Sequence, residues 1–275
     1  MITINTVFLI NSASQKTKCC EYLLRVLNHK IMKKAITIFW FRRDLRIDDN
    51  IGLFYCLRDG NNVLPLFIFD TVIISKLEDK TDSRITFIYE QIKTLKDFFE
   101  EKGSSLMVKT GKPLEVFRAM NDTFQIKSVY ANEDYEPYAN NRDNEIQKYL
   151  KSRNTAFYLF KDHVIFAKDD VLKKDGKPYT VFTPYMKMWK SHFASQQIPD
   201  YDISGYDDKF LRTDQFHFPG IEEIGFEESD GNFPPAKINT EKIRVYDKTR
   251  DYPALDGTSR LGIHLRFGTI SIRKL

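Results

Sequence analysis

The residues best suited to chemistry lie near the end of the chain, where residues 246–275 read YDKTRDYPALDGTSRLGIHLRFGTISIRKL. The run GTSRLG places a glycine, two hydroxyls and an arginine directly before a helical pattern. Hydroxyls, cations and the N–H groups of a helix start are the groups that bind phosphate in proteins. Thr258 and Ser259 therefore either bind phosphate oxygens or cap the helix, and residue types alone favour the ordinary cap.

The charge of the chain is unevenly distributed. The formal net charge is +4, yet residues 236–275 carry nine Lys and Arg against four Asp and Glu. Residues 35–235 carry 27 against 33, and residues 1–34 carry six against one. A basic closing stretch suits a phosphate-bearing partner, although a solvated helix face would have the same composition.

Elsewhere the sequence offers little for catalysis or metal binding. The five histidines show no metal-ligand spacing, so we assign no catalytic residue and no metal. Cys19 and Cys20 are adjacent and Cys56 is isolated, which fits neither a metal site nor a disulfide framework and favours a reducing, cytoplasmic compartment. No apolar run approaches the length that crosses a bilayer, so we expect no membrane.

Short apolar runs alternate with helical patterns from Ala35 onward, which predicts a parallel α/β sheet wound by crossover helices. The clearest helix covers residues 82–101, with Asp82 as its N-cap and Gly103 as its stop. A second helix is expected at about 139–153. The expected strands are 35–41, 63–70, 105–110 and 128–133, followed by a last strand or extended edge within 156–166.

The turn after the first strand argues against two common nucleotide sites. It reads FRRDLRIDDN, residues 41–50, and contains no glycine. A dinucleotide-binding turn would show GxGxxG there, and a phosphate loop would end in Lys and Ser or Thr. An NAD enzyme or a phosphate-loop NTPase is therefore not expected.

Four motifs in order resemble the photolyase and cryptochrome family. WFRRDLRIDDN (40–50) is similar to the family's opening signature, although Arg42, Arg43, Asp44 and Arg46 could also form a surface ion network. The later matches are YEPYANNRD (135–143), KPYTVFTPYMKMW (177–189) and YDKTRDYPALDGTSRL (246–261).

The resemblance implies an order of domains. Residues 1–32 would be an extension outside the fold, with Met32 as a possible true start, and residues 33–165 a Rossmann-like antenna domain. Residues 166–235 would be an interdomain linker, irregular from about Ile198. Residues 236–275 would begin an all-α flavin-binding domain that is incomplete in this chain.

The resemblance also implies a flavin site for FAD. Tyr246 stands at the position that contacts the flavin, and the phosphate-anchoring run is Thr258, Ser259, Arg260, Leu261 and Gly262. The family commonly has Ser where Gly262 stands, so only a backbone contact is expected there. Arg250 matches a residue that contacts the DNA backbone near the lesion. Its alternative is an ion pair with Asp247 or Asp251.

A second, light-harvesting chromophore of the folate or deazaflavin type is a further expectation of the resemblance. Some folate-binding members carry an Asn-Glu pair where this sequence has Tyr138 and Ala139. The carboxylate that would bind the pterin is therefore missing, and these residues do not support folate. The identity of the chromophore stays open.

The function that the resemblance implies is light-driven repair of cyclobutane pyrimidine dimers by electron transfer from reduced FAD, in a monomer acting on damaged DNA. One alternative is a cryptochrome, which binds FAD and signals through partners. Another is a free-standing nucleotide-binding α/β protein, which leaves TSRL unexplained. The helix expected to open at Thr258 has few partners for Leu261, Leu265 and Ile272, so we expect it to be loosely held or aggregation-prone. We also expect the chain itself to be inactive.

Overall fold

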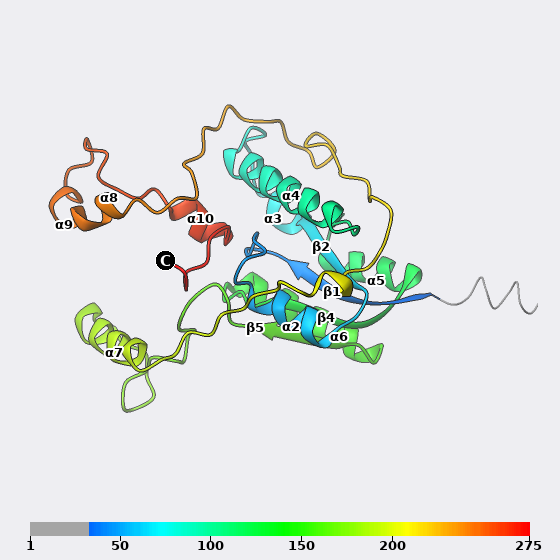
Figure 1. Ribbon diagram of the computed structural model, residues 1–275, viewed down its shortest axis with the longest axis horizontal. Helices are drawn as coiled ribbons and strands as arrows, with labels where there is room; N and C mark the ends of the chain where they lie inside the picture. The colour runs from blue at the N-terminus through cyan, green and yellow to red at the C-terminus, as the bar shows by residue number, and fades with distance from the viewer. Residues whose placement is uncertain (1–32) are drawn as a thin grey trace, which may run out of the picture.

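The computed structural model describes residues 33–275. The expected extension at residues 1–32 and the possible start at Met32 lie outside the described residues. The centre of the molecule is a five-stranded parallel sheet with strand order β3-β2-β1-β4-β5 (Figure 1). The strands are β1 (Lys34–Phe41), β2 (Val63–Asp70), β3 (Met107–Gly111), β4 (Phe124–Asn132) and β5 (Ala156–Phe160).

Helices cover both faces of this sheet. α2 (Ile51–Asp59) and α4 (Ser83–Glu101) pack on the face of Phe39 and Phe41, whereas α5 (Pro113–Thr123) and α6 (Pro137–Ser152) pack on the face of Ile38 and Trp40. The short helix α3 (Thr71–Ile74) follows β2 directly. The strand order reverses between β1 and β4, and the carboxyl ends of strands at such a switch point form the usual ligand crevice of doubly wound sheets.

The local sequence explains these elements. All eight residues of β2 are buried, as expected for an apolar run covered on both faces. The Asp82 carboxylate accepts a hydrogen bond from Arg84 N at 2.9 Å and caps α4, which confirms the predicted helix start. The predicted parallel α/β sheet is also confirmed, with β3 beginning two residues later and β4 four residues earlier than expected.

Part of the expected linker packs against the sheet unit. Residues 166–235 contain the helix α7 (Phe182–Ala194) and the 3-10 turn Asp207–Lys209. Leu211 N then donates to Val63 O at 2.9 Å, which ties this segment to β2. The segment adds five buried side chains to the two cores: Phe210, Leu211, Ile221, Ile224 and Phe226. The division of the chain into domains remains a prediction.

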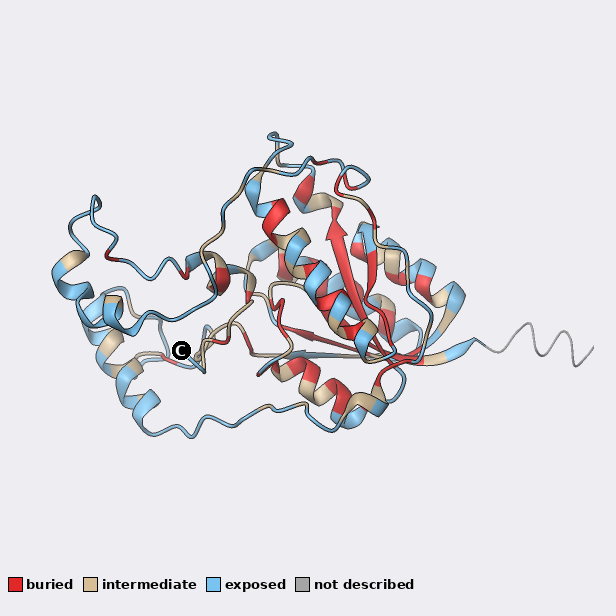
Figure 2. Cartoon of the chain, turned by 45° about the horizontal axis from the view of Figure 1, so that its top comes forward, coloured by how far each residue is buried: buried red, intermediate tan, exposed pale blue. Residues whose placement is uncertain are grey.

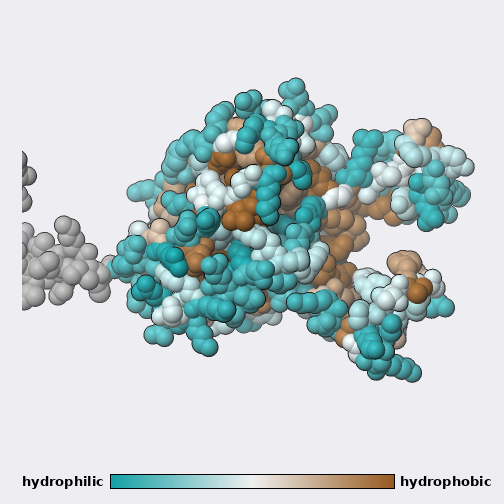
Figure 3. Space-filling view, turned by 180° about the vertical axis from the view of Figure 1, so that it is seen from behind, coloured by the Kyte–Doolittle hydropathy of each residue, from teal (hydrophilic) through white to brown (hydrophobic). Residues whose placement is uncertain are grey.

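Two segments project from the sheet unit and are largely exposed (Figure 2). One is α7, and the other contains α8 (Thr240–Arg244) and α9 (Tyr246–Thr249); none of these three helices has a buried residue. In Figure 3 they form separate lobes that both carry apolar side chains. The exposed apolar residues are Val181, Phe182, Phe193, Ile243, Val245, Tyr246, Tyr252 and Leu255. Among the described residues, no helix is long and apolar enough to cross a membrane.

The last helix differs from the expectation in two ways. α10 (Gly262–Phe267) begins after Thr258 and Ser259, so neither hydroxyl caps it. The expectation of a loosely held helix is wrong, because Leu261 and His264 are only 3% and 4% exposed. α10 and the residues after it lie against the end of the sheet, and the contacts described below hold them there (Figure 1).

Candidate functional site

The switch point of the sheet is filled by polar side chains of the protein itself. Asn132, at the end of β4, donates through Nδ2 to Asp44 Oδ2 at 2.6 Å and to Asn50 Oδ1 at 2.8 Å. Its Oδ1 accepts from Gly52 N at 2.9 Å. Burial raises the pKa of the Asp44 carboxyl, although the Arg42 backbone N–H and the Asn132 amide both stabilise its charge. These contacts join the loop after β1 to the end of β4.

Two arginines share one carboxylate beside this crevice. Arg42 Nη1 lies 2.6 and 2.7 Å from the Asp143 oxygens, and Arg142 Nε lies 3.0 Å from Asp143 Oδ1. The two guanidinium groups lie 5.0 and 4.9 Å from the centre of the Trp40 ring. Burial lowers the pKa of Arg42. The side chains of Arg42, Asp44 and Arg46 are buried, so the alternative of a surface ion network is wrong for these three residues. Arg43 is partly buried and pairs at 2.6 Å with Glu136, whose side chain is 44% exposed.

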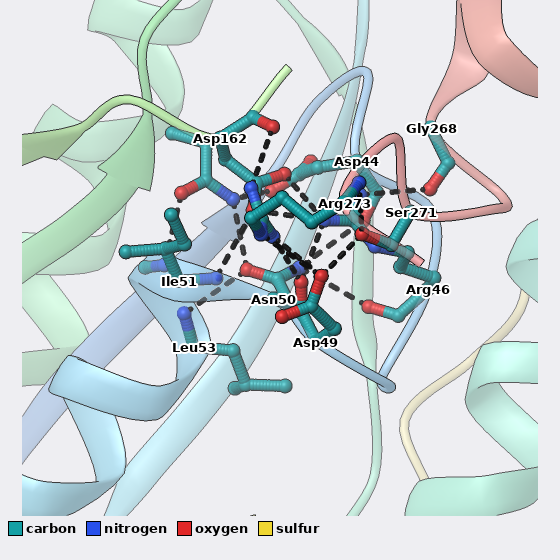
Figure 4. Close-up of polar contacts among 12 residues, drawn as sticks. Asp44, Arg46, Asp49, Asn50, Ile51, Leu53, Asp162, Gly268, Ser271 and Arg273 are labelled. Atoms are coloured by element: carbon teal, nitrogen blue, oxygen red, sulfur yellow. Dashed lines mark hydrogen bonds and ion pairs between the residues drawn. The ribbon is translucent and has the colours of Figure 1, made fainter. Parts of the chain in front are cut away.

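A second buried network surrounds Asp162, which follows β5 (Figure 4). Arg46 Nη2 donates to its two oxygens at 2.8 and 2.7 Å, and the Asp162 side chain is fully buried. Asp162 Oδ1 also accepts from Ile51 N at 3.1 Å, the first residue of α2. A carboxylate at a helix start is favourable because it meets unpaired N–H groups and the positive end of the helix dipole. Asp162 thus ties β5 to α2.

The end of the chain completes this second network. Arg273 donates through Nε to Asp49 Oδ2 and through Nη2 to Asp162 Oδ1, both at 2.9 Å. Ser271 Oγ donates to the Asp49 carboxylate. We call Arg46, Asp49, Asp162, Ser271 and Arg273 the clamp (Figure 4). It joins three regions of the sequence, so it fixes the closing stretch on the switch point.

Backbone contacts place the closing stretch within the clamp. Leu45 N donates to Phe267 O at 3.0 Å, and Arg46 Nη1 donates to Gly268 O at 3.1 Å. Gly268 has a φ of 63°, and a Cβ there would collide with the backbone carbonyl of Arg43. Only glycine suits this position, because it both adopts the left-handed conformation and lets the two backbones approach.

The phosphate-anchoring run predicted from the sequence lies largely on the surface. Thr258, Ser259, Arg260 and Gly262 are exposed, whereas the Leu261 side chain is buried and leaves only its backbone for a ligand. Arg260 has a left-handed φ of 54°, a conformation that costs a non-glycine residue energy and often marks a functional position.

A groove of about 470 Å³ runs past the Ser259 and Arg260 side chains. Lys237 and Lys242 also line it, and Asp256 lies 2.5 Å from Lys242 Nζ and 3.2 Å from Arg260 Nη2. The groove therefore collects three cations, two of them paired with Asp256, and a hydroxyl, and its net positive charge suits a pyrophosphate. Gly262 has no side-chain or backbone neighbour within 4 Å of an added Cβ, so a ligand can approach its backbone closely.

Tyr246 and Arg250 lie apart from this groove. The Tyr246 side chain is 49% exposed on α9 and does not line the groove. Arg250 Nε lies 3.5 Å from Asp251 Oδ1, and both side chains are more than half exposed. Such an exposed pair holds the arginine weakly, so Arg250 is free to reach a phosphate. The structure brings Ser259 and Arg260 to one groove and leaves the roles of all these residues as proposals.

Tyr138 and Ala139 stand where some folate-binding relatives were expected to carry an Asn-Glu pair, with Ala139 at the position of the carboxylate. The Tyr138 hydroxyl donates to Asp70 Oδ2 at 2.6 Å, and burial followed by this bond raises the pKa of Tyr138. Lys76 Nζ and the Arg142 guanidinium lie 5.7 and 5.8 Å from its ring centre. Ala139 is buried. Neither residue offers a carboxylate, and the identity of a second chromophore stays open.

Sequence reasoning missed the clamp. Arg273 and Ser271 stood inside the quoted closing stretch, and Asp49 inside the first motif, but nothing in either segment marked them as partners. The closing stretch is basic, but the first motif carries three arginines and three aspartates, so charge composition gave no signal for this pairing. Among residues 33–275, no group of three or more His, Cys, Asp or Glu is arranged to hold a metal ion.

The fold and these contacts define a class: a doubly wound parallel α/β domain whose switch point is sealed by its own ion pairs and by a closing helical stretch. Comparison with known proteins identifies the family within that class. The chain belongs to the DNA photolyase family, whose sequence profile matches residues 37–202.

Individual relatives agree with this assignment. The chain is 29% identical over 260 residues to the deoxyribodipyrimidine photo-lyase of Synechococcus sp. (strain PCC 6301), covering 87% of this chain and 52% of the relative. It is 27% identical to a Synechococcus sp. (strain PCC 6716) protein named "Uncharacterized 31.6 kDa protein in atpI 5'region", covering 88% of each. The chain thus spans about half the length of the named photo-lyase and most of the shorter protein.

A solved structure shows the same fold. The crystal structure of an archaeal photolyase from Sulfolobus tokodaii with two FAD molecules superposes with a TM-score of 0.61 at 24% identity. The match covers 87% of this chain and 53% of that one. The matches to this archaeal photolyase and to the Synechococcus photo-lyase therefore both align this chain with about half of a longer protein.

Proposed function

We propose that this chain supplies the α/β domain and the first part of the flavin site of a photolyase, which repairs cyclobutane pyrimidine dimers in DNA by light-driven electron transfer from reduced FAD. The family assignment and the relatives named deoxyribodipyrimidine photo-lyase support this reaction. The observation that carries it is the docked closing stretch, which presents Ser259 and Arg260 on a cationic groove. We expect the protein to act as a monomer in the cytoplasm.

The residues of the groove fit the phosphates of FAD. Ser259 can donate its hydroxyl, and Arg260, Lys237 and Lys242 can neutralise charge. Thr258 is exposed next to Ser259 and can donate a further hydroxyl hydrogen bond. When bound, FAD supplies the light absorption and the electron, so the chain needs no nucleophile or general base of its own. The task of these residues is to bind and orient the cofactor.

The proposed DNA contact is Arg250. Its side chain is 58% exposed and extends from the basic closing stretch, where a phosphate can replace Asp251 as its partner. A phosphate contact positions DNA without reading its sequence, which suits an enzyme that must recognise a dimer in any context. Tyr246, exposed on α9, is the proposed aromatic contact to the flavin.

A chimera tests this proposal. The chain replaces the aligned half of the Synechococcus photo-lyase, so that the relative supplies the sequence outside the match. We expect the purified chimera to carry FAD and, after reduction, to repair a thymine dimer in an oligonucleotide under blue light but not in the dark. Arg250→Ala should weaken binding to dimer-containing DNA with unchanged flavin content.

The outcomes separate the alternatives. A folded chimera that holds FAD and repairs no dimer would favour a cryptochrome-type receptor over a repair enzyme. A folded chimera without flavin would show that the groove at Ser259 and Arg260 is not a flavin site. Arg260→Ala within an active chimera should release FAD more readily, whereas Arg244→Ala, outside the groove, should not.

A further inference from the structure

A second groove, far from the closing stretch in the sequence, opens at the edge of the sheet. It has a volume of about 540 Å³ and lies between α2, β4 and β5. β5 is last in the strand order, so no described strand pairs with its outer side. The alternate residues Ala156, Tyr158 and Phe160 line the groove, as the two-residue repeat of a strand requires. The proposed flavin and DNA contacts use none of these residues.

Aromatic rings form the floor of this groove. Tyr55 of α2 stacks on Phe160 with ring centres 4.9 Å apart and planes at 8°. Tyr130 is nearly parallel to Phe160 at 6.0 Å and lies 4.8 Å from Tyr158. The inner rings are packed against one another, so they hold Tyr158 in place. Tyr158 itself is 45% exposed and presents ring surface to solvent.

Cations border the same floor. The Arg58 guanidinium lies 4.4 Å from the centre of the Tyr55 ring, and Lys127 of β4 also lines the groove. Asp59 pairs with Arg58 at 2.6 Å, yet the Arg58 side chain remains 48% exposed. With Asp59 as the only acidic residue in the lining, the groove keeps a net positive charge. An exposed aromatic ring in a groove of net positive charge suits a ligand that has both a flat ring and a negative charge.

We propose that this groove binds single-stranded nucleic acid, with a base stacked on Tyr158 and the adjacent phosphates next to Arg58 and Lys127. Proteins that hold single strands combine these two features, since every base has a face for stacking and every nucleotide has a phosphate. A duplex keeps its bases stacked inside and cannot offer one to Tyr158. The groove therefore selects unpaired nucleotides without reading their sequence.

Fluorescence anisotropy with a labelled single-stranded oligothymidylate tests the proposal on the chain as it exists. We expect binding at low salt that a duplex of equal length displaces poorly. Tyr158→Ala should weaken it roughly tenfold, the loss of one stacked base. Tyr158→Phe should bind like the parent because the ring remains. Phe182→Ala removes a 72% exposed aromatic side chain of α7 and is the matched control, expected to have no effect.

Charge variants keep the test decisive if Tyr158→Ala disturbs folding. Lys127 is exposed, so Lys127→Glu should leave the fold intact, weaken binding and lower its salt dependence. Lys190→Glu, the same charge reversal at an exposed lysine of α7 that does not line the groove, should leave single-strand binding unchanged. The proposal fails if the parent does not bind, if duplex competes equally, or if Tyr158→Ala and Lys127→Glu both bind like the parent.

Discussion

Arg273 Nη2 lies 2.9 Å from Asp162 Oδ1, with 8% of the arginine side chain and none of the aspartate side chain exposed. This ion pair joins the residue that follows the last strand of the sheet to the end of the closing stretch. Taking both charges out of water is costly, so the pair is favourable only because further bonds surround it. Arg46 on Asp162 and Asp49 on Arg273 supply those bonds.

The first prediction concerns this pair. Arg273→Ala removes a cation that two buried carboxylates share, and breaking one partner of a buried pair costs about 3–5 kcal/mol. We expect the free energy of unfolding to fall by an amount near the lower end of this range, because Arg46 still pairs with Asp162. Thermal unfolding should show the loss, and limited proteolysis should cut residues 236–275 faster. Lys274→Ala breaks an exposed pair with Asp48 and should change little. Equal losses in the two variants would contradict a special role for Arg273.

Gly268 offers a second test of how the closing stretch docks. Gly268→Ala adds a Cβ in a left-handed conformation and against the Arg43 carbonyl. Gly176 is the matched control, because its φ is 76° but an added Cβ meets nothing within 4 Å. Gly176→Ala should cost about 1 kcal/mol for the conformation alone. Gly268→Ala should cost clearly more, measured by denaturant unfolding. A loss no larger than that of Gly176→Ala would mean that the closing stretch can move away.

His163 predicts a pH dependence. Burial, followed by the nearby Arg43, lowers the pKa of His163 below its ordinary value of 6.5, with Asp134 and Asp162 opposing the shift. The unfolded chain therefore takes up a proton at a higher pH than the folded one. The stability contributed by neutral His163 is complete above about pH 6.5 and is lost as the pH falls below it. Unfolding free energies from pH 7.5 to 5 should fall less for His163→Gln. Parallel curves for parent and variant would contradict this account.

The sheet was predictable because its signals are local. The run 63–70 is apolar up to its last residue, Asp70, and became β2 with the same bounds. Asp82 preceded a clear helical stripe. The packing of residues 210–226 was not predictable, since Phe210, Ile221 and Phe226 have neither helical nor strand periodicity. Their burial depends on the sheet surface that they cover, which no local pattern encodes.

The candidate site was likewise predictable only in part. The hydroxyls and arginine of GTSRLG were visible as a phosphate-binding composition, and the structure places Ser259 and Arg260 on one groove. The clamp was not visible, because Asp49 and Arg273 are separated by 224 residues and meet only after the sheet has formed. The aromatic groove at Tyr158 forms where α2, β4 and β5 meet. It therefore depends on tertiary packing, which the local sequence does not reveal.

The last prediction concerns whether the chain alone binds FAD, as seen in its absorbance spectrum. The groove at Ser259 and Arg260 and the Tyr246 ring can contact a flavin dinucleotide, but all of them lie on an open surface. A ligand of this size binds well only when most of its surface is buried. We therefore expect the 275-residue chain, purified alone, to show no stoichiometric flavin absorbance and no dimer repair, although the clamp fixes Ser271 and Arg273 on the sheet. The chimera with the Synechococcus photo-lyase is the positive control. Absorbance spectra of the chain alone and of the chimera decide the question. Stoichiometric flavin bands in the chain alone would show that the exposed groove is sufficient and that burial contributes less to FAD binding than the ligand's size suggests.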